Sequence, residues 1–251
     1  MDKYLKKAFE TGLVDVVMEW MKTEKHVSVS SIQKNFEVDY KTASAIYNYL
    51  IDENLTREML TFNSIDDLSN SNIKLPLKVY LLDINHDITE ALHREFDKYS
   101  DVEIINDDFA HFMDTHKDIE CIVSPANSFG CMDGGYDEAI TDYFGLEVEF
   151  EVQDYIKKYL FGEQPVGSSI IVDIPNTNKK LIHTPTMRLP SPIVDETLIY
   201  HCMRSTLITA INGQIKSLVI PAFGGATGKL KPDVIAENMR KGYEQILSNY
   251  K

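Results

Sequence analysis

The first fifty residues alternate apolar and polar positions with a helical period. Residues 13–21 place most of their apolar side chains three or four positions apart, which predicts an amphipathic helix. Ser30 or Ser31 can cap a second short helix that runs through Phe36, and Asp39 can cap a third. The apolar positions of the third helix are Ala43, Ala45, Ile46, Tyr49 and Leu50. The pattern predicts three short helices.

Residues 54–62 follow these helices and can return as a small hairpin or wing. Three short helices followed by a wing are typical of a helix-turn-helix or winged-helix module, so residues 1–62 are predicted to form one. Residues 63–74 read NSIDDLSNSNIK, are rich in Asn, Ser and Asp, and precede Pro76. This composition predicts a linker over residues 63–76.

Apolar strands alternate with helical segments after the linker. Predicted strands cover residues 78–84, 102–105, 119–123, 169–174, 180–183 and 217–221, and predicted helices cover residues 88–99, 195–212 and 232–248. Strands that alternate with helices favour a layered α/β domain with a mostly parallel sheet. Residues 77–251 are therefore predicted to form one such domain.

The composition is that of a globular protein that can bury a core. Of the 251 residues, 43% are hydrophobic, 10% aromatic and 25% charged, which excludes disorder, collagen and coiled coil. No apolar run approaches the roughly 18 to 20 residues that cross a bilayer, and residues 1–10 are too charged for a secretory leader. Cys121, Cys131 and Cys202 form no closely spaced pair. We therefore expect a cytoplasmic protein with free thiols and no membrane partner.

The charge balance limits the ligands that the chain can hold. The chain has 25 Lys and Arg against 39 Asp and Glu, a formal net charge of −14. Residues 1–75 hold 9 basic and 12 acidic residues, which leaves −11 for the remainder. Generic binding to nucleic acid needs many Lys and Arg to replace counterions, so this class is disfavoured. A compact anion can still be held by backbone N–H groups at helix N-termini or glycine loops.

Two glycine-rich loops follow apolar strands directly, at the sheet edge where open α/β sheets bind ligands. The first lies in residues 121–140, CIVSPANSFGCMDGGYDEAI, and the second in residues 217–232, SLVIPAFGGATGKLKP. Neither contains GxGxxG or the Walker pattern GxxxxGK[ST], so a nucleoside triphosphatase is poorly supported. Either loop alone is equally explained by a left-handed turn without a ligand.

Together these loops resemble the signature of the macrodomain family, whose members bind ADP-ribose. The motifs SPANSFGCMDGGYDEAI and IPAFGGATGKLKP occur in register and are separated by the strand motif LIHTP, and IINDDF precedes them. The resemblance covers about residues 77–251. It implies a three-layer α/β/α macrodomain with a mixed, mostly parallel sheet.

The resemblance also implies roles for individual residues. Asp108 takes the position that accepts a hydrogen bond from the adenine amino group, and Asn127 takes the position that orients the distal ribose. Each side chain also has a purely structural alternative. Asp108 could act as an N-cap, and Asn127 could hydrogen-bond to the loop backbone. The implied ligand-binding set is Asp108, Phe109, Ala126, Gly134, Gly135, Tyr136, Gly224, Gly225, Ala226, Thr227, Gly228 and Leu230.

Asn127 and Asp137 are the candidate catalytic residues. Asp137 lies ten positions after Asn127, the spacing of the hydrolytic branch of the family. A carboxylate beside the distal ribose could orient a water molecule and stabilise oxocarbenium-like charge. The alternative is a first-turn carboxylate that complements the helix dipole. Ser124 stands where many relatives have asparagine, and Leu230 stands roughly where many have an aromatic residue.

No metal site and no cofactor are expected. His111, His116 and Cys121 lack any known ligand spacing, and the first loop holds Cys131 without partners. A nucleophilic pair of Cys131 and His183 is weakly supported, and His183 is interpreted as a structural histidine of its strand.

The N-terminal segment resembles the winged-helix gamma domain of the FtsK DNA translocase. The similarity covers about residues 13–54 and includes KHVSVSSIQKNFEVDYKTASAIYNYLIDENL. That family carries arginines in this region, whereas here Glu37 and Asp39 flank the turn and Lys34 and Lys41 are the nearby bases. DNA binding, contact with a protein partner and a passive structural role all stay open.

Three functions are therefore compatible with the sequence. The favoured one is an ADP-ribosyl hydrolase that removes ADP-ribose from a modified target or hydrolyses a related derivative. The second is a non-catalytic sensor of ADP-ribose or an NAD-derived signal, coupled to DNA or a protein through the N-terminal module. The third is a domain that binds another nucleotide, because a fold does not determine its ligand.

Overall fold

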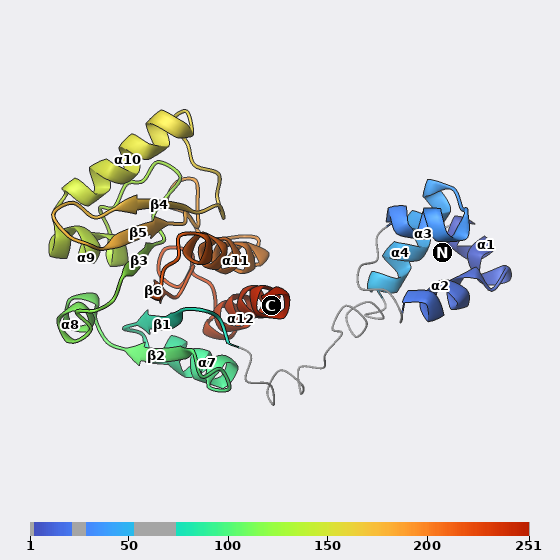
Figure 1. The fold of residues 1–251 in the computed structure, drawn as a ribbon, viewed down its shortest axis with the longest axis horizontal. Helices are drawn as coiled ribbons and strands as arrows, with labels where there is room; N and C mark the ends of the chain where they lie inside the picture. Colours follow the sequence, from blue (N-terminus) through green and yellow to red (C-terminus); the bar gives the residue numbers. More distant parts are fainter. Residues whose placement is uncertain (1–2, 22–28, 53–73, 251) are drawn as a thin grey trace. The chain divides into compact units, whose positions relative to one another are not determined.

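The computed structural model describes residues 3–21, 29–52 and 74–250, which fall into two compact units. The division places Met1–Asn72 in the N-terminal unit and Ile73–Lys251 in the C-terminal unit (Figure 1). The predicted wing at residues 54–62 lies outside the described residues, as does nearly all of the predicted linker.

The N-terminal unit consists of helices around a small apolar core. The helices are α1 (Lys3–Glu10), α2 (Leu13–Met21), α3 (Val29–Phe36) and α4 (Tyr40–Asp52). Their buried side chains are Ala8, Val14, Val17, Ile32, Ala43, Ile46 and Leu50. The prediction of a helix over residues 13–21 is confirmed, and α1 is an addition that the sequence pattern did not reveal.

The caps of the N-terminal helices were predicted with mixed success. Asp39 caps α4, because its carboxylate accepts from the backbone N–H of Thr42 at 3.0 Å and from the Thr42 hydroxyl at 2.9 Å. The expected cap at Ser30 or Ser31 is wrong, since α3 begins at Val29 and both serines lie in its first turn.

The C-terminal unit is built on a mixed sheet with the strand order β2-β1-β6-β3-β5-β4. The strands are β1 (Lys78–Asp83), β2 (Val102–Asn106), β3 (Cys121–Ser124), β4 (Ile170–Asp173), β5 (Lys180–His183) and β6 (Ser217–Pro221). Only the β4–β5 pair within this sheet is antiparallel. The expectation of a mixed, mostly parallel sheet is confirmed.

Helices cover both faces of the sheet and make three layers (Figure 1). They are α7 (His86–Phe96), α8 (Phe109–Thr115), α9 (Gly135–Phe144), α10 (Glu147–Tyr159), α11 (Thr197–Asn212) and α12 (Pro232–Asn249). Successive strand residues point to opposite faces. Leu81 thus packs in the core under α7, α11 and α12, and Leu82 packs in the core under α8, α9 and α10.

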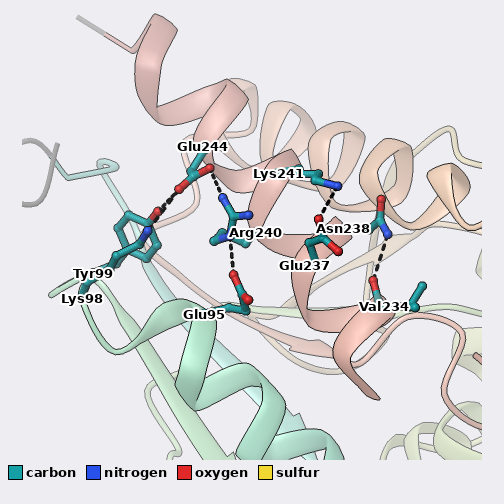
Figure 2. Close-up of polar contacts among 9 residues, drawn as sticks. All are labelled: Glu95, Lys98, Tyr99, Val234, Glu237, Asn238, Arg240, Lys241 and Glu244. Carbon is teal, nitrogen blue, oxygen red and sulfur yellow. Dashed lines mark hydrogen bonds and ion pairs between the residues drawn. The ribbon is translucent and has the colours of Figure 1, made fainter. Parts of the chain in front are cut away.

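Polar contacts join α12 to α7 and to Tyr99, which follows α7 in the chain. Arg240 pairs with Glu95 and with Glu244, and Glu244 also accepts from the Tyr99 hydroxyl (Figure 2). The groups come from segments far apart in sequence, so the network ties the C-terminal helix to the first helix of the layered domain.

A second, buried contact fixes the start of the same unit. The Tyr243 hydroxyl donates to the Asp101 carboxylate, at 2.9 Å and 2.8 Å from its two oxygens. Asp101 also accepts from the backbone N–H of Leu75 at 2.8 Å.

Across residues 3–21, 29–52 and 74–250, no helix has both the length and the apolar character needed to cross a membrane.

Candidate functional site

A cavity of about 510 Å³ opens at the carboxyl ends of the central parallel strands. Its walls come from the ends of β1 and β6, from the loops that follow β3, β5 and β6, and from the first residues of α8 and α9. This volume is within the range of small-molecule sites. The position is also the one where α/β sheets bind ligands, since the strand-end loops converge there.

Almost all of the predicted site residues line this one cavity. The lining members are Asp108, Phe109, Ala126, Asn127, Gly134, Gly135, Tyr136, Asp137, Gly224, Gly225, Ala226, Thr227 and Gly228. Leu230 is the exception, because it lies outside the cavity wall and packs, partly buried, against the core under α7, α11 and α12. Segments up to 120 residues apart in the sequence therefore meet around this one cavity.

The Asn127 amide organises the first loop. Its Oδ1 accepts from the backbone N–H of Phe129 at 3.0 Å and from that of Cys131 at 3.4 Å. Its Nδ2 donates to the Cys131 carbonyl at 3.4 Å. The side chain thus binds the loop backbone, and it still borders the cavity. Both interpretations of Asn127 are compatible with this geometry.

Two glycines of the first loop face open space at the start of α9. Gly134 is the residue before the helix, and Gly135 has a φ of +59°, a left-handed conformation that favours glycine. A Cβ added to either glycine would meet no atom within 4 Å. The first N–H groups of a helix have no acceptor within the helix. The backbone here can therefore approach a ligand closely.

The glycines of the second loop are packed instead. A Cβ on Gly228 would lie 2.6 Å from the Gly224 carbonyl oxygen, and one on Gly225 would lie 2.8 Å from a methyl carbon of Ile88. The Gly228 carbonyl accepts from the backbone N–H of Ile193 at 3.0 Å. These glycines allow the loop to fold tightly against itself and its neighbours.

Asp137 is a buried carboxyl group in the first turn of α9. It is 8% exposed, and its Oδ1 accepts from the Ser124 hydroxyl at 2.6 Å. Burial raises the pKa of Asp137 to about 7, and the carboxylates of Asp133 and Glu149 also act to raise it. The hydrogen bonds from Ser124 and from the Ala126 backbone act in the opposite direction. Near neutral pH this group can therefore both bind and release a proton.

Asp108 begins α8 at another side of the cavity. Its Oδ1 accepts from the backbone N–H of His111 at 2.9 Å, so the carboxylate acts as an N-cap. Phe109 is buried beside it and contacts the ring of Tyr136 edge to face, with 5.3 Å between the centroids. The phenol oxygen of Tyr136 is buried and has no hydrogen-bond partner in the part of the chain that the structure describes.

The cavity is acidic. Five carboxyl groups line it, and no Lys, Arg or His does so among the residues that the structure describes; the five are Asp83, Asp107, Asp108, Asp133 and Asp137. Burial raises the pKa of Asp83 as well. An anionic ligand would therefore depend on backbone N–H groups, because the wall offers no cationic side chain.

Several wall residues were not in the predicted site set, although Cys131 among them had been placed in the first loop. They are Leu82, Asp83, Ile84, Asp107, Pro125, Cys131, Asp133, Ala139, Thr186, Met187, Pro190, Pro221 and Ala222. The rule that ligands bind at strand ends could have found Asp83, since it ends β1. Thr186 and Met187 gave no such signal, because their place depends on the bridge between Asn127 and Met187.

His183, which was considered as a partner of Cys131, lies away from the cavity that Cys131 lines. His183 is fully buried, its Nδ1 contacts the Gln164 Oε1 at 2.7 Å, and burial lowers its pKa to about 3. It does not line the cavity, so it forms no pair there with Cys131. Within the described part of the chain, no three His, Cys, Asp or Glu side chains gather as metal ligands.

Comparisons with known proteins agree with this architecture. Residues 123–239 match the family model of the Macro domain. An uncharacterized protein of Aquifex aeolicus is 32% identical over 126 residues, which span 50% of this chain and 73% of the relative. The chain therefore belongs to the macrodomain family, and the matched residues lie in its C-terminal unit.

One solved structure shares the fold at low sequence identity. A mutant of the Oceanobacillus iheyensis macrodomain aligns with 72% of this chain and 82% of its own, at a TM-score of 0.50 and 20% identity. Another mutant of the macrodomain from this bacterium, with ADPR, covers 53% of this chain and 73% of its own, at a TM-score of 0.47 and 23% identity.

Proposed function

We propose that the cavity binds ADP-ribose and that the C-terminal unit hydrolyses the bond between ADP-ribose and a modified target. The observation that carries this proposal is the Asp137 carboxyl group, buried in the cavity wall with a pKa of about 7. A carboxyl group that titrates near neutral pH is suited to general acid–base chemistry. Its place beside the open glycines of the first loop supports a role next to a bound anion.

The wall suggests how ADP-ribose would lie. The N–H groups at Gly134 and Gly135 would hold the diphosphate, because both glycines line the cavity and a Cβ built on either would meet no described atom within 4 Å. Asp108 has a second carboxylate oxygen that can accept from the adenine amino group, and Phe109 offers an apolar contact. The distal ribose would then lie near Asn127 and Asp137.

In the proposed reaction, water attacks the anomeric carbon of the distal ribose. The oxygen of water forms the new bond, and the bond from this carbon to the target breaks. The Asp137 carboxylate orients the water and receives its proton, and it stabilises the positive charge that develops on the sugar. The proton then goes to the leaving group, so only water is consumed and no cofactor is needed.

Binding is tested by isothermal titration of the full chain with ADP-ribose, with AMP and NAD as comparison ligands. Selective binding of ADP-ribose supports the proposal. Affinity that is equal for all three ligands contradicts it and favours a domain for another nucleotide.

Turnover is tested by release of ADP-ribose from ADP-ribosylated protein and from ADP-ribosylated nucleic acid. Asp137→Ala is expected to lose turnover while its affinity for ADP-ribose stays within about tenfold, roughly 1.4 kcal/mol. Turnover at the wild-type rate in this variant contradicts the proposed role of Asp137.

A sensor coupled to nucleic acid is the second candidate, and one feature of the N-terminal unit favours it. A hollow between α1 and α4 is lined by two lysines and three tyrosines, namely Lys3, Lys41, Tyr4, Tyr40 and Tyr49. The ammonium groups of Lys3 and Lys41 lie 5.0 Å and 5.7 Å from the Tyr4 ring centroid. Cationic and aromatic groups together suit phosphates and bases. This proposal agrees with the resemblance to a winged-helix module.

The sensor is tested by fluorescence anisotropy of labelled DNA with the full chain, with and without ADP-ribose. Binding that Lys3→Ala and Lys41→Ala weaken, and that ADP-ribose changes, supports the sensor. Lys6→Ala is a matched control, since Lys6 belongs to α1 but does not line the hollow. A Kd that is the same with and without ADP-ribose contradicts the coupling.

A further inference from the structure

We propose that Ser124 is a positioning residue, whose hydroxyl holds the Asp137 carboxylate in the orientation and the ionised form that the hydrolysis requires. This inference rests on the proposed function. Ser124 is fully buried at the end of β3, and its Oγ donates to the Asp137 Oδ1 at 2.6 Å. The resemblance to the macrodomain family singles out Ser124 only as the residue that stands where many relatives have asparagine.

The hydrogen bond joins a helix to the centre of the sheet. β3 lies between β6 and β5, and the Ser124 carbonyl accepts from the backbone N–H of Thr184 at 2.9 Å. Asp137 belongs to α9, which starts at the left-handed Gly135 with open space beside it. Ser124 therefore ties the carboxylate, on the wall of the cavity, to a strand that is paired on both sides.

The charges around Asp137 show why this donor matters. Asp133 in the first loop and Glu149 on α10 act against ionisation, as does burial. Two donors favour the ionised carboxylate, namely the Ser124 hydroxyl at the end of β3 and the backbone N–H of Ala126 just beyond it. The phenol of Tyr136 on the same helix is neutral, because burial raises its pKa. Loss of the Ser124 hydroxyl thus removes one of two stabilising donors, and no cationic side chain of the described wall replaces it.

The chain offers a matched control. Ser128 is also fully buried and lies four residues beyond Ser124, but its Oγ has no hydrogen-bond partner among the described residues. Ser124→Ala and Ser128→Ala therefore remove the same atom from two buried sites, and only the first removes a donor to Asp137. Ser124→Cys is a nearly isosteric second variant with a weak donor, for use if Ser124→Ala does not fold.

The first readout is the titration of the Asp137 carboxyl carbon in the full chain, by ¹³C NMR with labelled aspartate. The signal is assigned by its absence in Asp137→Asn. Ser124→Ala is expected to raise the midpoint by about one pH unit, because a hydrogen bond to a charged group favours the ionised form. Ser128→Ala is expected to leave it unchanged. An unchanged midpoint in Ser124→Ala overturns the inference.

The second readout is turnover against pH. In Ser124→Ala the acidic limb of the kcat profile is expected to move upward by the same amount as the midpoint, with ADP-ribose affinity within about threefold. A shifted midpoint without a shifted profile overturns the role of Ser124 in positioning Asp137 for the reaction. If the wild-type chain has no turnover, the proposed function is wrong. If the wild type is active and the midpoint does not shift, only the inference about Ser124 is wrong.

Discussion

The two glycine-rich loops of the C-terminal unit use the same residue type for different physical reasons. In the first loop, Gly134 and Gly135 border open space beside the cavity. In the second loop, Gly225 and Gly228 would bring a Cβ within 2.8 Å and 2.6 Å of neighbouring atoms. The first pair leaves room for a ligand, and the second pair leaves room for the protein itself.

The comparison separates binding from folding within one site. Substitution in the second loop should act mainly on the free energy of unfolding, because the added atoms have no space. Substitution in the first loop should act mainly on ligand affinity, because the added atoms enter the cavity. Three experiments can break or sharpen this distinction.

Gly228→Ala is expected to have the largest effect. Its Cβ would contact the backbone of Gly224, which cannot turn aside as a flexible side chain can. We expect a loss of about 3 kcal/mol in the free energy of unfolding, the upper end of the usual cost of overpacking. Urea denaturation measures it. If the variant is as stable as the wild type, the second loop is not tightly packed.

Asp137→Asn tests the titrating group that follows the first loop. Burial raises the pKa of the folded Asp137 from 3.8 to about 7, so the folded state keeps this proton to higher pH than the unfolded state does. The stability that Asp137 contributes is therefore present at acidic pH and is lost as the pH rises through about 7. As the pH rises from 5.5 to 7.5, the free energy of unfolding should therefore fall by about 2 kcal/mol less in the variant than in the wild type.

Urea denaturation at several pH values measures this difference. Asp233→Asn serves as a control, because Asp233 is an exposed carboxylate that does not line the cavity. Parallel stability curves for the wild type and Asp137→Asn would mean that Asp137 is already ionised at pH 5.5.

Alanine substitutions at Gly134 and Gly135 form the smallest and most selective test. Gly135→Ala places a side chain at a φ of +59°, with a cost of about 1 kcal/mol in stability. Gly134→Ala is at an extended φ of −164° with no atom within 4 Å, so its stability should change by less than about 0.5 kcal/mol.

Both variants should weaken ADP-ribose binding by about tenfold, because a methyl group would separate the ligand from the backbone. Calorimetric titration measures the affinity, and thermal unfolding measures the stability. Gly134→Ala with normal affinity would show that the first loop does not approach the ligand.

Much of the fold could be predicted from local patterns. The alternation of apolar strands and helices predicted the mostly parallel sheet, and the runs at residues 180–183 and 217–221 match β5 and β6 in full. The helices α8 and α10 were not predicted. The seven residues of α8 are too short for a clear helical period, and α10 carries a dense mixture of charges between its apolar positions.

The candidate site was predictable to the extent that its residues occur in motifs. Asn127, Asp137 and the glycines of both loops were identified from their order in the chain, and they line one cavity. Leu230 was expected in the same wall, but the tight turn after Gly224 directs it to the apolar core. Its neighbours there come from distant segments, so no local pattern could have placed it.

The sequence by itself determined the order of the strands, the order of the helices other than α1, α8 and α10, the strand-end position of both glycine loops and the ten-residue spacing of Asn127 and Asp137. Those features depend on neighbours along the chain. Only the tertiary structure decided which glycines are open, where Leu230 points and how far the pKa of Asp137 rises. These properties depend on atoms brought into contact from segments such as β3, α10 and the loop of Ile193, and packing and electrostatics act through distance in space.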